Sequence, residues 1–200
     1  MVDLGTGESW RHLDNIPQVH PDLGFVAVIW GEVVYSFQGI GQPLSTVKFG
    51  ADGIALSADG ETLYWSAVAG RYLYSVPTAR LRDRSVTSEI MAQASVVNHL
   101  QKGVSDGLET DSNGLIYAGN LEDNSIELFN PVNNTLSVFV RDPRMGWVDT
   151  LSVATDGYVY FTANQLWRSP GFYPGTDRRV KPFVLFRAKM PGNATKVNLQ

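Results

Sequence analysis

The chain has 200 residues, enough for one large domain or two small ones with a buried core. Hydrophobic residues make up 44% and charged residues 18%, which is typical of a globular rather than a disordered protein. The absence of cysteine excludes a disulfide framework and any thiolate site for zinc or an iron–sulfur cluster. A formal net charge of −4 lacks the positive surplus that nucleic acids and anionic membranes attract, so we expect neither partner.

The N-terminal quarter contains two short β-type runs, Val2–Leu4 and Ser9–Leu13, followed by an irregular stretch up to residue 50. The longest apolar run, Phe25–Trp30, is too short to span a bilayer. The first ten residues lack the basic start and apolar core of a signal peptide. We therefore expect outer strands and loops here, and neither a membrane anchor nor a leader.

Three later segments start alike, which indicates an internal repeat. They read DGIALSADGETLYWSAV from Asp52, DGLETDSNGLIYAGNLE from Asp106 and DTLSVATDGYVYFTANQL from Asp149. In each, an Asp precedes a short alternating apolar run, a turn pair and then a strand centred on an aromatic residue. The turn pairs, Asp59-Gly60, Asn113-Gly114 and Asp156-Gly157, predict two-residue hairpins because they accept positive φ.

Further strands follow the first two hairpins. Third strands are expected at Arg71–Val76 and Ser125–Phe129, and candidate fourth strands at Ser88–Ala92 and Leu136–Val140. Helix is scarce, with a turn or two expected within residues 79–84 and 87–100.

A period of about 40–50 residues with four short strands per unit is typical of β-propeller blades. We therefore predict an all-β propeller with blades at residues 51–104, 105–147 and 148–200, and with residues 1–50 as the outer part of a preceding blade. A β-sandwich is the alternative, but it gives no reason for the recurring Asp. Because about three and a half blades fall short of the four that a closed ring needs, a second copy or an N-terminal half would complete it.

Several segments together resemble the major royal jelly protein/yellow family. They are VDLGTGESWRHL (residues 2–13), ADGIALSADGETLYWSAVAGRYLYSVPTARLRD (51–83), SDGLETDSNGLIYAG (105–119), DPRMGWVDTLSVATDGYVYFTANQLWR (142–168) and LFRAKM (185–190). The resemblance implies a six-bladed propeller about twice this length and an extracellular, secreted protein. Known roles in the family include dopachrome conversion, amine binding, and nutritive or structural functions. The first strands are also distantly similar to gluconolactonase propellers, in which an acid or amide at the start of a strand binds a divalent metal.

The three repeat-starting carboxylates, Asp52, Asp106 and Asp149, are the main candidate site residues. In a propeller the innermost strand of each blade lines the central channel, so a residue that recurs at its start points to one axial site. Such carboxylates either bind a hard cation such as calcium, for which Asp52 and Asp106 are the candidates, or raise one another's pKa. An architectural role, in which each Asp accepts backbone N–H bonds, is the competing interpretation.

Three further residues are candidates near the channel mouth. Asn120 and Asn164 follow the central Tyr of their blades and are candidate hydrogen-bonding amides, although turn-initiating Asn is the commoner role. Trp147 precedes Asp149 by two residues and is a candidate for stacking an aromatic ligand, with core packing as the alternative.

From these residues we expect a small aromatic or cyclic ligand at the channel. If the protein is an enzyme, Asp106 or Asp149 would move a proton in an isomerisation while Asn164 polarises a carbonyl group. One alternative is a lactonase-like hydrolase with a divalent ion on Asp52 and Asp106, and another is a non-catalytic binding or structural protein. No cofactor is certain. Two N-x-T sequons, at Asn133 and Asn193, are compatible with secretion and glycosylation.

Overall fold

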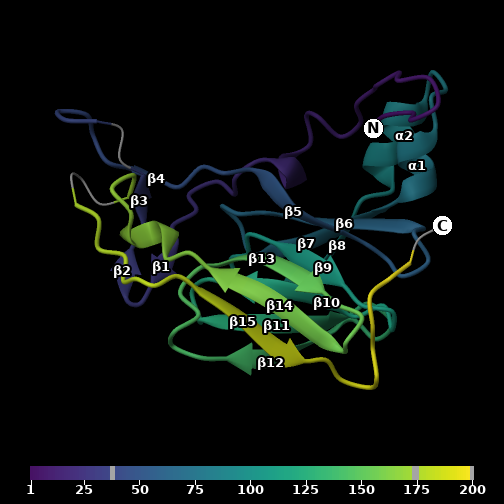
Figure 1. The fold of residues 1–200 in the computed structure, drawn as a ribbon. Coiled ribbons are helices and arrows are strands. Elements are labelled where there is room, and N and C mark those ends of the chain that lie inside the picture. Colours follow the sequence, from purple (N-terminus) through teal and green to yellow (C-terminus); the bar gives the residue numbers. More distant parts are fainter. Residues whose placement is uncertain (37–38, 173–175, 199–200) are drawn as a thin grey trace.

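The computed structural model describes residues 1–36, 39–172 and 176–198, and it is built mainly from antiparallel sheets (Figure 1). Neighbouring strands in each sheet are also neighbours in the sequence. The first sheet consists of β5 (Ala51–Leu56), β6 (Thr62–Ala67), β7 (Tyr72–Pro77) and β8 (Val97–Gln101). The second consists of β9 (Leu108–Thr110), β10 (Ile116–Asn120), β11 (Ser125–Asn130) and β12 (Thr135–Arg141). The third contains β13 (Val148–Val153), β14 (Tyr158–Ala163) and β15 (Val184–Lys189).

Each repeat opens with an antiparallel hairpin, because its turn carries a glycine that adopts positive φ. The φ angles are 74° at Gly60, 78° at Gly114 and 85° at Gly157. The connecting loops, residues 57–61, 111–115 and 154–157, are longer than the two-residue loops predicted from the turn pairs. Side chains within the loops stabilise the extra residues, as where Asp59 accepts hydrogen bonds from Ser57 Oγ at 2.5 Å and Glu61 N at 3.0 Å. The hairpins are therefore present, with wider turns than expected.

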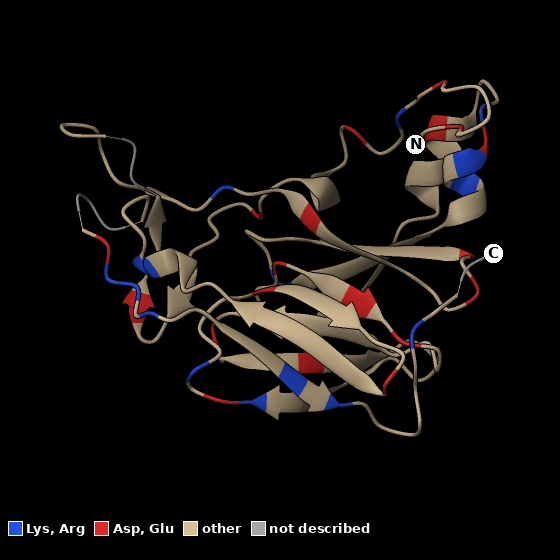
Figure 2. Ribbon diagram, in the orientation of Figure 1, with Lys and Arg blue, Asp and Glu red and all other residues tan. Residues whose placement is uncertain are grey.

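The three sheets pack face to face in the manner of propeller blades, and their inner strands β5, β9 and β13 lie next to one another. Glycine makes this close approach feasible. A Cβ atom built on Gly53 would overlap the backbone O of Asp106, and one on Gly107 would overlap the backbone O of Asp149. The Asp-Gly pairs of the first two repeats thus bring successive inner strands together. Charged residues lie mostly in the loops that connect the strands (Figure 2).

Two small hairpins, which we call the cap, cover one end of the sheets. They are β1 (Val28–Ile29) with β2 (Glu32–Val33), and β3 (Tyr35–Ser36) with β4 (Ser45–Thr46). The cap shares one apolar core with the loops of all three sheets, formed by Phe25, Ala27, Ile29, Val34, Val47, Ala69, Val104, Leu121, Trp147 and Trp167. The core fixes the loops at this end of the sheets, including the residues just before β9 and β13.

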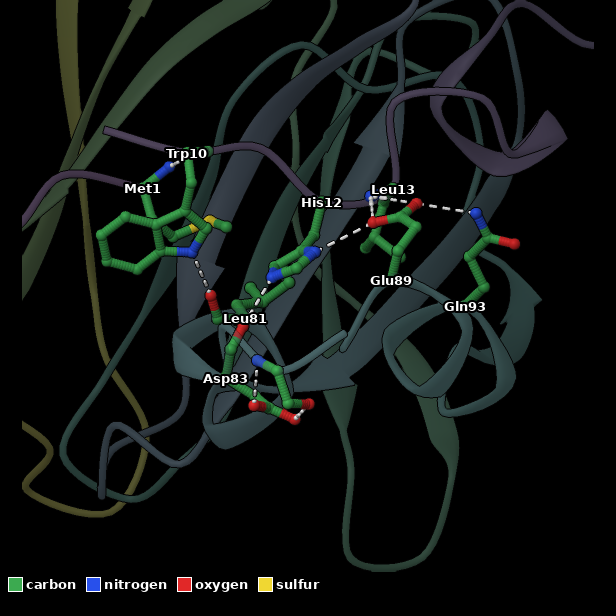
Figure 3. A network of polar contacts seen from close by, with 9 residues as sticks. Met1, Trp10, His12, Leu13, Leu81, Asp83, Glu89 and Gln93 are labelled. Carbon is green, nitrogen blue, oxygen red and sulfur yellow. Dashed lines mark hydrogen bonds and ion pairs between the residues drawn. The ribbon is translucent and has the colours of Figure 1, made fainter. Parts of the chain in front are cut away.

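The N-terminal arm, residues 1–19, ends in the short helix η1 (Pro17–Val19) and packs against α1 (Thr78–Arg82) and α2 (Ser88–Ala94). Figure 3 shows His12 between the two helices: its Nε2 donates to the backbone O of Asp83 at 2.8 Å, and its Nδ1 lies 2.9 Å from Glu89 Oε2. Within the described residues, no helix has the length and apolar character needed to cross a bilayer.

The structure corrects two strand predictions. The expected strands Val2–Leu4 and Ser9–Leu13 reduce to a single bridge between residues 2 and 9, because this arm contacts helices and finds no sheet edge to extend. The expected fourth strand at residues 88–92 is α2, and the strand that completes the sheet is β8. Glu, Met, Ala and Gln are good helix formers, so the local sequence of α2 favours a helix over a strand.

Candidate functional site

The repeat-starting carboxylates meet at the inner strands. Asp52, Asp106 and Asp149 line a common pocket of about 220 Å³, together with the residues that follow each of them. Asp52 is exposed, whereas Asp106 and Asp149 are half-buried. Because the glycines at positions 53 and 107 lack a side chain, the three strands approach closely enough for the carboxylates to influence one another.

Asp106 occupies the middle strand of the three and has the most perturbed carboxyl group. The indole N–H of Trp147 donates to its Oδ2 at 2.8 Å. Burial raises the pKa of Asp106 to about 6; the hydrogen bond from Trp147 opposes this rise, and the charges of Asp149 and Asp52 add to it. A carboxyl group with a pKa near neutrality can both accept and donate a proton at physiological pH.

Asp149 is held by an amide. Asn164 Nδ2 donates to Asp149 Oδ2 at 2.6 Å, and Asn164 Oδ1 accepts the backbone N–H of Leu166 at 2.8 Å. Asn164 lines a neighbouring hollow with Arg179 rather than the pocket of the three carboxylates. Asn164 is therefore placed to position Asp149, and this bond uses one of the two hydrogens of its amide group.

The other two predicted residues take different places. Trp147 is only 2% exposed and belongs to the core beneath the cap, so it offers Asp106 its N–H and leaves no open ring face toward the pocket. Asn120 packs against Gly103, and its Nδ2 lies 3.3 Å from Glu127 Oε1. Asn120 is absent from the lining of the carboxylate pocket.

The divalent ion expected on Asp52 and Asp106 stays a prediction. Among the residues that the structure describes, no three His, Cys, Asp or Glu side chains are grouped so that they could hold one. One oxygen of Asp106 is already bonded to Trp147, and one of Asp149 to Asn164. We therefore derive no chemical step through a cation.

A buried lysine, which no sequence pattern indicates, precedes Asp106 by four residues in the chain. Lys102 is 1% exposed, and its Nζ donates to the backbone O of Gly103 at 3.1 Å. Burial lowers the pKa of its amine to about 7. A lone Lys after a strand carries no sequence signal, because its burial results from tertiary packing.

The Trp147 hydrogen bond can be tested by Trp147→Phe. We expect the pKa of Asp106 to rise further, because the bond that favours the charged carboxylate is lost. The free energy of unfolding should fall by about 1–2 kcal/mol. The pH dependence of the Asp106 carboxyl ¹³C shift measures the pKa. Trp167→Phe is the matched control, since this ring is equally buried and packs on Trp30; an equal pKa change in both variants would contradict the assignment.

Comparison with known proteins identifies the family. The family model for major royal jelly proteins matches residues 1–182. The chain belongs to the major royal jelly protein family. The resemblance seen in residues 51–83 is thereby confirmed. No curated protein matches this family member in sequence.

Solved structures show the fold of this family member. It is similar to a gluconolactonase from Xanthomonas campestris, with 19% identity and a TM-score of 0.51 over 72% of this chain and 45% of the other. A putative gluconolactonase is similar with 11% identity and a TM-score of 0.50, over 72% of this chain and 47% of the other. At these identities the likeness shows the fold alone, a β-propeller. The chain spans about half the length of these structures.

Proposed function

We propose that the carboxylate pocket of this royal jelly family member is a proton-transfer site for a small cyclic or aromatic molecule. The observation that supports this most strongly is the position of Asp106, half-buried between two other carboxylates and held by an indole N–H. A general acid–base works best when its pKa lies near the working pH, and the pKa of Asp106 is raised to about 6.

The chemistry is an isomerisation without net consumption of protons. The Asp106 carboxylate takes a proton from a C–H or O–H group of the ligand, and the electron pair of that bond moves into the conjugated ring system. The carboxylic acid thus formed returns the proton to a second ligand atom. Each cycle restores Asp106, so no co-reactant is required.

The neighbouring residues tune this step. Asp149, positioned by Asn164, keeps negative charge beside Asp106 and so favours the protonated carboxyl group. Asp52 is exposed at the rim of the pocket and favours neutral or cationic ligands over anionic ones. Phenolic and amine-bearing rings match this charge pattern.

The proposal is tested by following dopachrome conversion by absorbance, with catechol amine binding measured by calorimetry. We expect turnover to depend on a group with a pKa near 6, and Asp106→Asn to lower it by about 100-fold or more. Asp156→Asn, in an exposed turn of the third sheet, is the control and should change neither quantity. Unchanged turnover and binding in Asp106→Asn and Asp149→Asn would refute the proposal. Binding without turnover in the unmodified protein would favour a binding protein.

We also infer that the protein is extracellular. Members of its family are secreted. Both sequon residues, Asn133 and Asn193, are exposed, as glycosylation requires.

We also propose that a second copy or an N-terminal half completes the ring. The measured mass of the protein in solution distinguishes the two.

A further inference from the structure

A second pocket, of about 390 Å³, is lined in part by the cap and shares no residue with the carboxylate pocket. Its lining combines the tryptophans of the cap and of η2 (Leu166–Arg168) with basic residues. Figure 2 shows basic residues on η2 and on the chain that leads into β15. The lining residues that matter here are Trp30, Arg144, Trp167, Arg168 and Lys181.

The aromatic floor of the pocket is built by long-range contacts. The rings of Trp30 and Trp167 lie 6.1 Å apart at an angle of 43°. Trp30 is fixed by its indole N–H, which donates to Asn124 Oδ1 at 2.6 Å, while 48% of its surface stays exposed. Trp167 is buried, and its ring lies so close to Gly146 that a side chain at that position would overlap it. The floor is therefore preformed, with an open aromatic surface on Trp30.

Arg168 supplies positive charge next to the tryptophan rings. Its guanidinium carbon lies 4.7 Å from the Trp30 ring centre and 5.1 Å from that of Trp167. In the described part of the chain, no carboxylate lies within ion-pair distance of Arg168. A guanidinium stacked on indole rings keeps its N–H donors in the ring plane, where a carboxylate can bind two of them at once.

The acids nearby are already paired with other arginines. Asp142 binds Arg144 at 2.8 Å, Asp177 binds Arg179 at 2.8 Å, and Glu32 binds Arg178 at 3.0 Å. Among the described residues that line the pocket, none is acidic, whereas Arg168 and the exposed Lys181 add positive charge to it. The charged side chains of its lining are thus opposite in sign to those of the carboxylate pocket.

We propose that this pocket binds a small planar aromatic carboxylate. The ring would stack on the exposed face of Trp30, and the carboxylate would accept hydrogen bonds from Arg168, with Lys181 adding charge at the rim. Gln165 shapes the wall, because its side-chain amide bonds both the N–H and the C=O of Val180, at 3.0 and 2.8 Å. This site is independent of the proton-transfer chemistry proposed for Asp106.

Calorimetric titration of the purified chain with three naphthalene probes tests the proposal: naphthoate, the uncharged naphthylmethanol and the cationic naphthylmethylamine. We expect naphthoate to bind about tenfold or more tightly than the alcohol, and the amine to bind weakest. Arg168→Gln should remove the difference between naphthoate and the alcohol, while Trp30→Ala should weaken both. Arg187→Gln is the matched control, since Arg187 stacks on Tyr158 at 4.5 Å outside the pocket.

Equal affinity for naphthoate and the alcohol in the unmodified chain would overturn the proposal, as would an unchanged preference in Arg168→Gln. Asp106→Asn should leave naphthoate binding unaltered; if it abolished binding while Arg168→Gln did not, the ligand would lie in the carboxylate pocket and the proposal would fail. Should Arg168→Gln not fold, Lys181→Gln provides the same comparison, since Lys181 is exposed and its loss should reduce the preference for naphthoate.

Discussion

Gly107→Ala should lower the free energy of unfolding by about 3 kcal/mol, because the added methyl group has no room between two inner strands. A Cβ atom there would overlap the backbone O of Asp149 and lie 3.1 Å from Leu151 Cδ1. A backbone atom in a hydrogen-bonded strand cannot rotate away, so the third sheet must move as a whole. For a chain of this size the thermal midpoint should fall by about 6–12 °C, which calorimetry or circular dichroism measures.

Two controls separate this steric effect from a backbone effect. Gly114→Ala places a methyl group in open space but at a φ of +78°, so it should cost about 1 kcal/mol through strain alone. Thr150→Ala, at the matching exposed position of the third repeat, should change stability by less than about 0.5 kcal/mol. A loss in Gly107→Ala no larger than in Gly114→Ala would show that the inner strands tolerate separation.

Asp106→Asn should stabilise the protein at pH 7.5, even though it removes the proposed acid–base group. The pKa of this carboxyl group is about 6 in the folded protein and near 3.8 when unfolded, so the folded state holds the proton more strongly. Its contribution to stability is therefore most favourable below pH 3.8, declines as the pH rises toward 6, and is lost above that. Removing the charge should add about 1–2 kcal/mol at pH 7.5, after allowance for partial exposure.

Thermal unfolding of Asp106→Asn and the unmodified protein between pH 4 and 8 measures this difference. The stabilisation should be largest above pH 6 and vanish near pH 4. Asp59→Asn provides a control of opposite sign, because hydrogen bonds from Ser57 and Glu61 lower the pKa of the Asp59 carboxyl group. A stabilisation of Asp106→Asn that does not vary with pH would contradict the raised pKa.

Much of the fold could be predicted because its determinants are local. The turn glycines adopt the positive φ that the Asp-Gly and Asn-Gly pairs favour, and the recurring Asp marks the inner strand of each sheet. The strand predicted at residues 88–92 was wrong, because the apolar pattern there is compatible with both a fourth strand and the helix α2. The cap was also missed: its two-residue strands are too short to leave a periodic signal.

The site could be predicted only in part, because only some of its determinants are local in the sequence. The three carboxylates occupy the same position in each repeat, and this repetition was enough to predict that they lie together. The bond between Trp147 and Asp106, by contrast, joins residues from different repeats and depends on side-chain orientation. Burial of Lys102 and the stacking of Arg168 on Trp30 likewise result from tertiary packing, which residue spacing does not encode.

The long-range contacts of the cap affect the order in which the protein folds. In each sheet the strands that pair are successive in the sequence, whereas the cap is joined to the rest by contacts such as Trp30 with Asn124 and Glu32 with Arg178, far apart in the sequence. Loop closure costs more entropy as the intervening chain lengthens, and such contacts are repaid only once the sheets exist. We therefore expect the cap to order last during folding and to open first in the native state. Opening of the cap would then also open the aromatic pocket, whose floor includes Trp30.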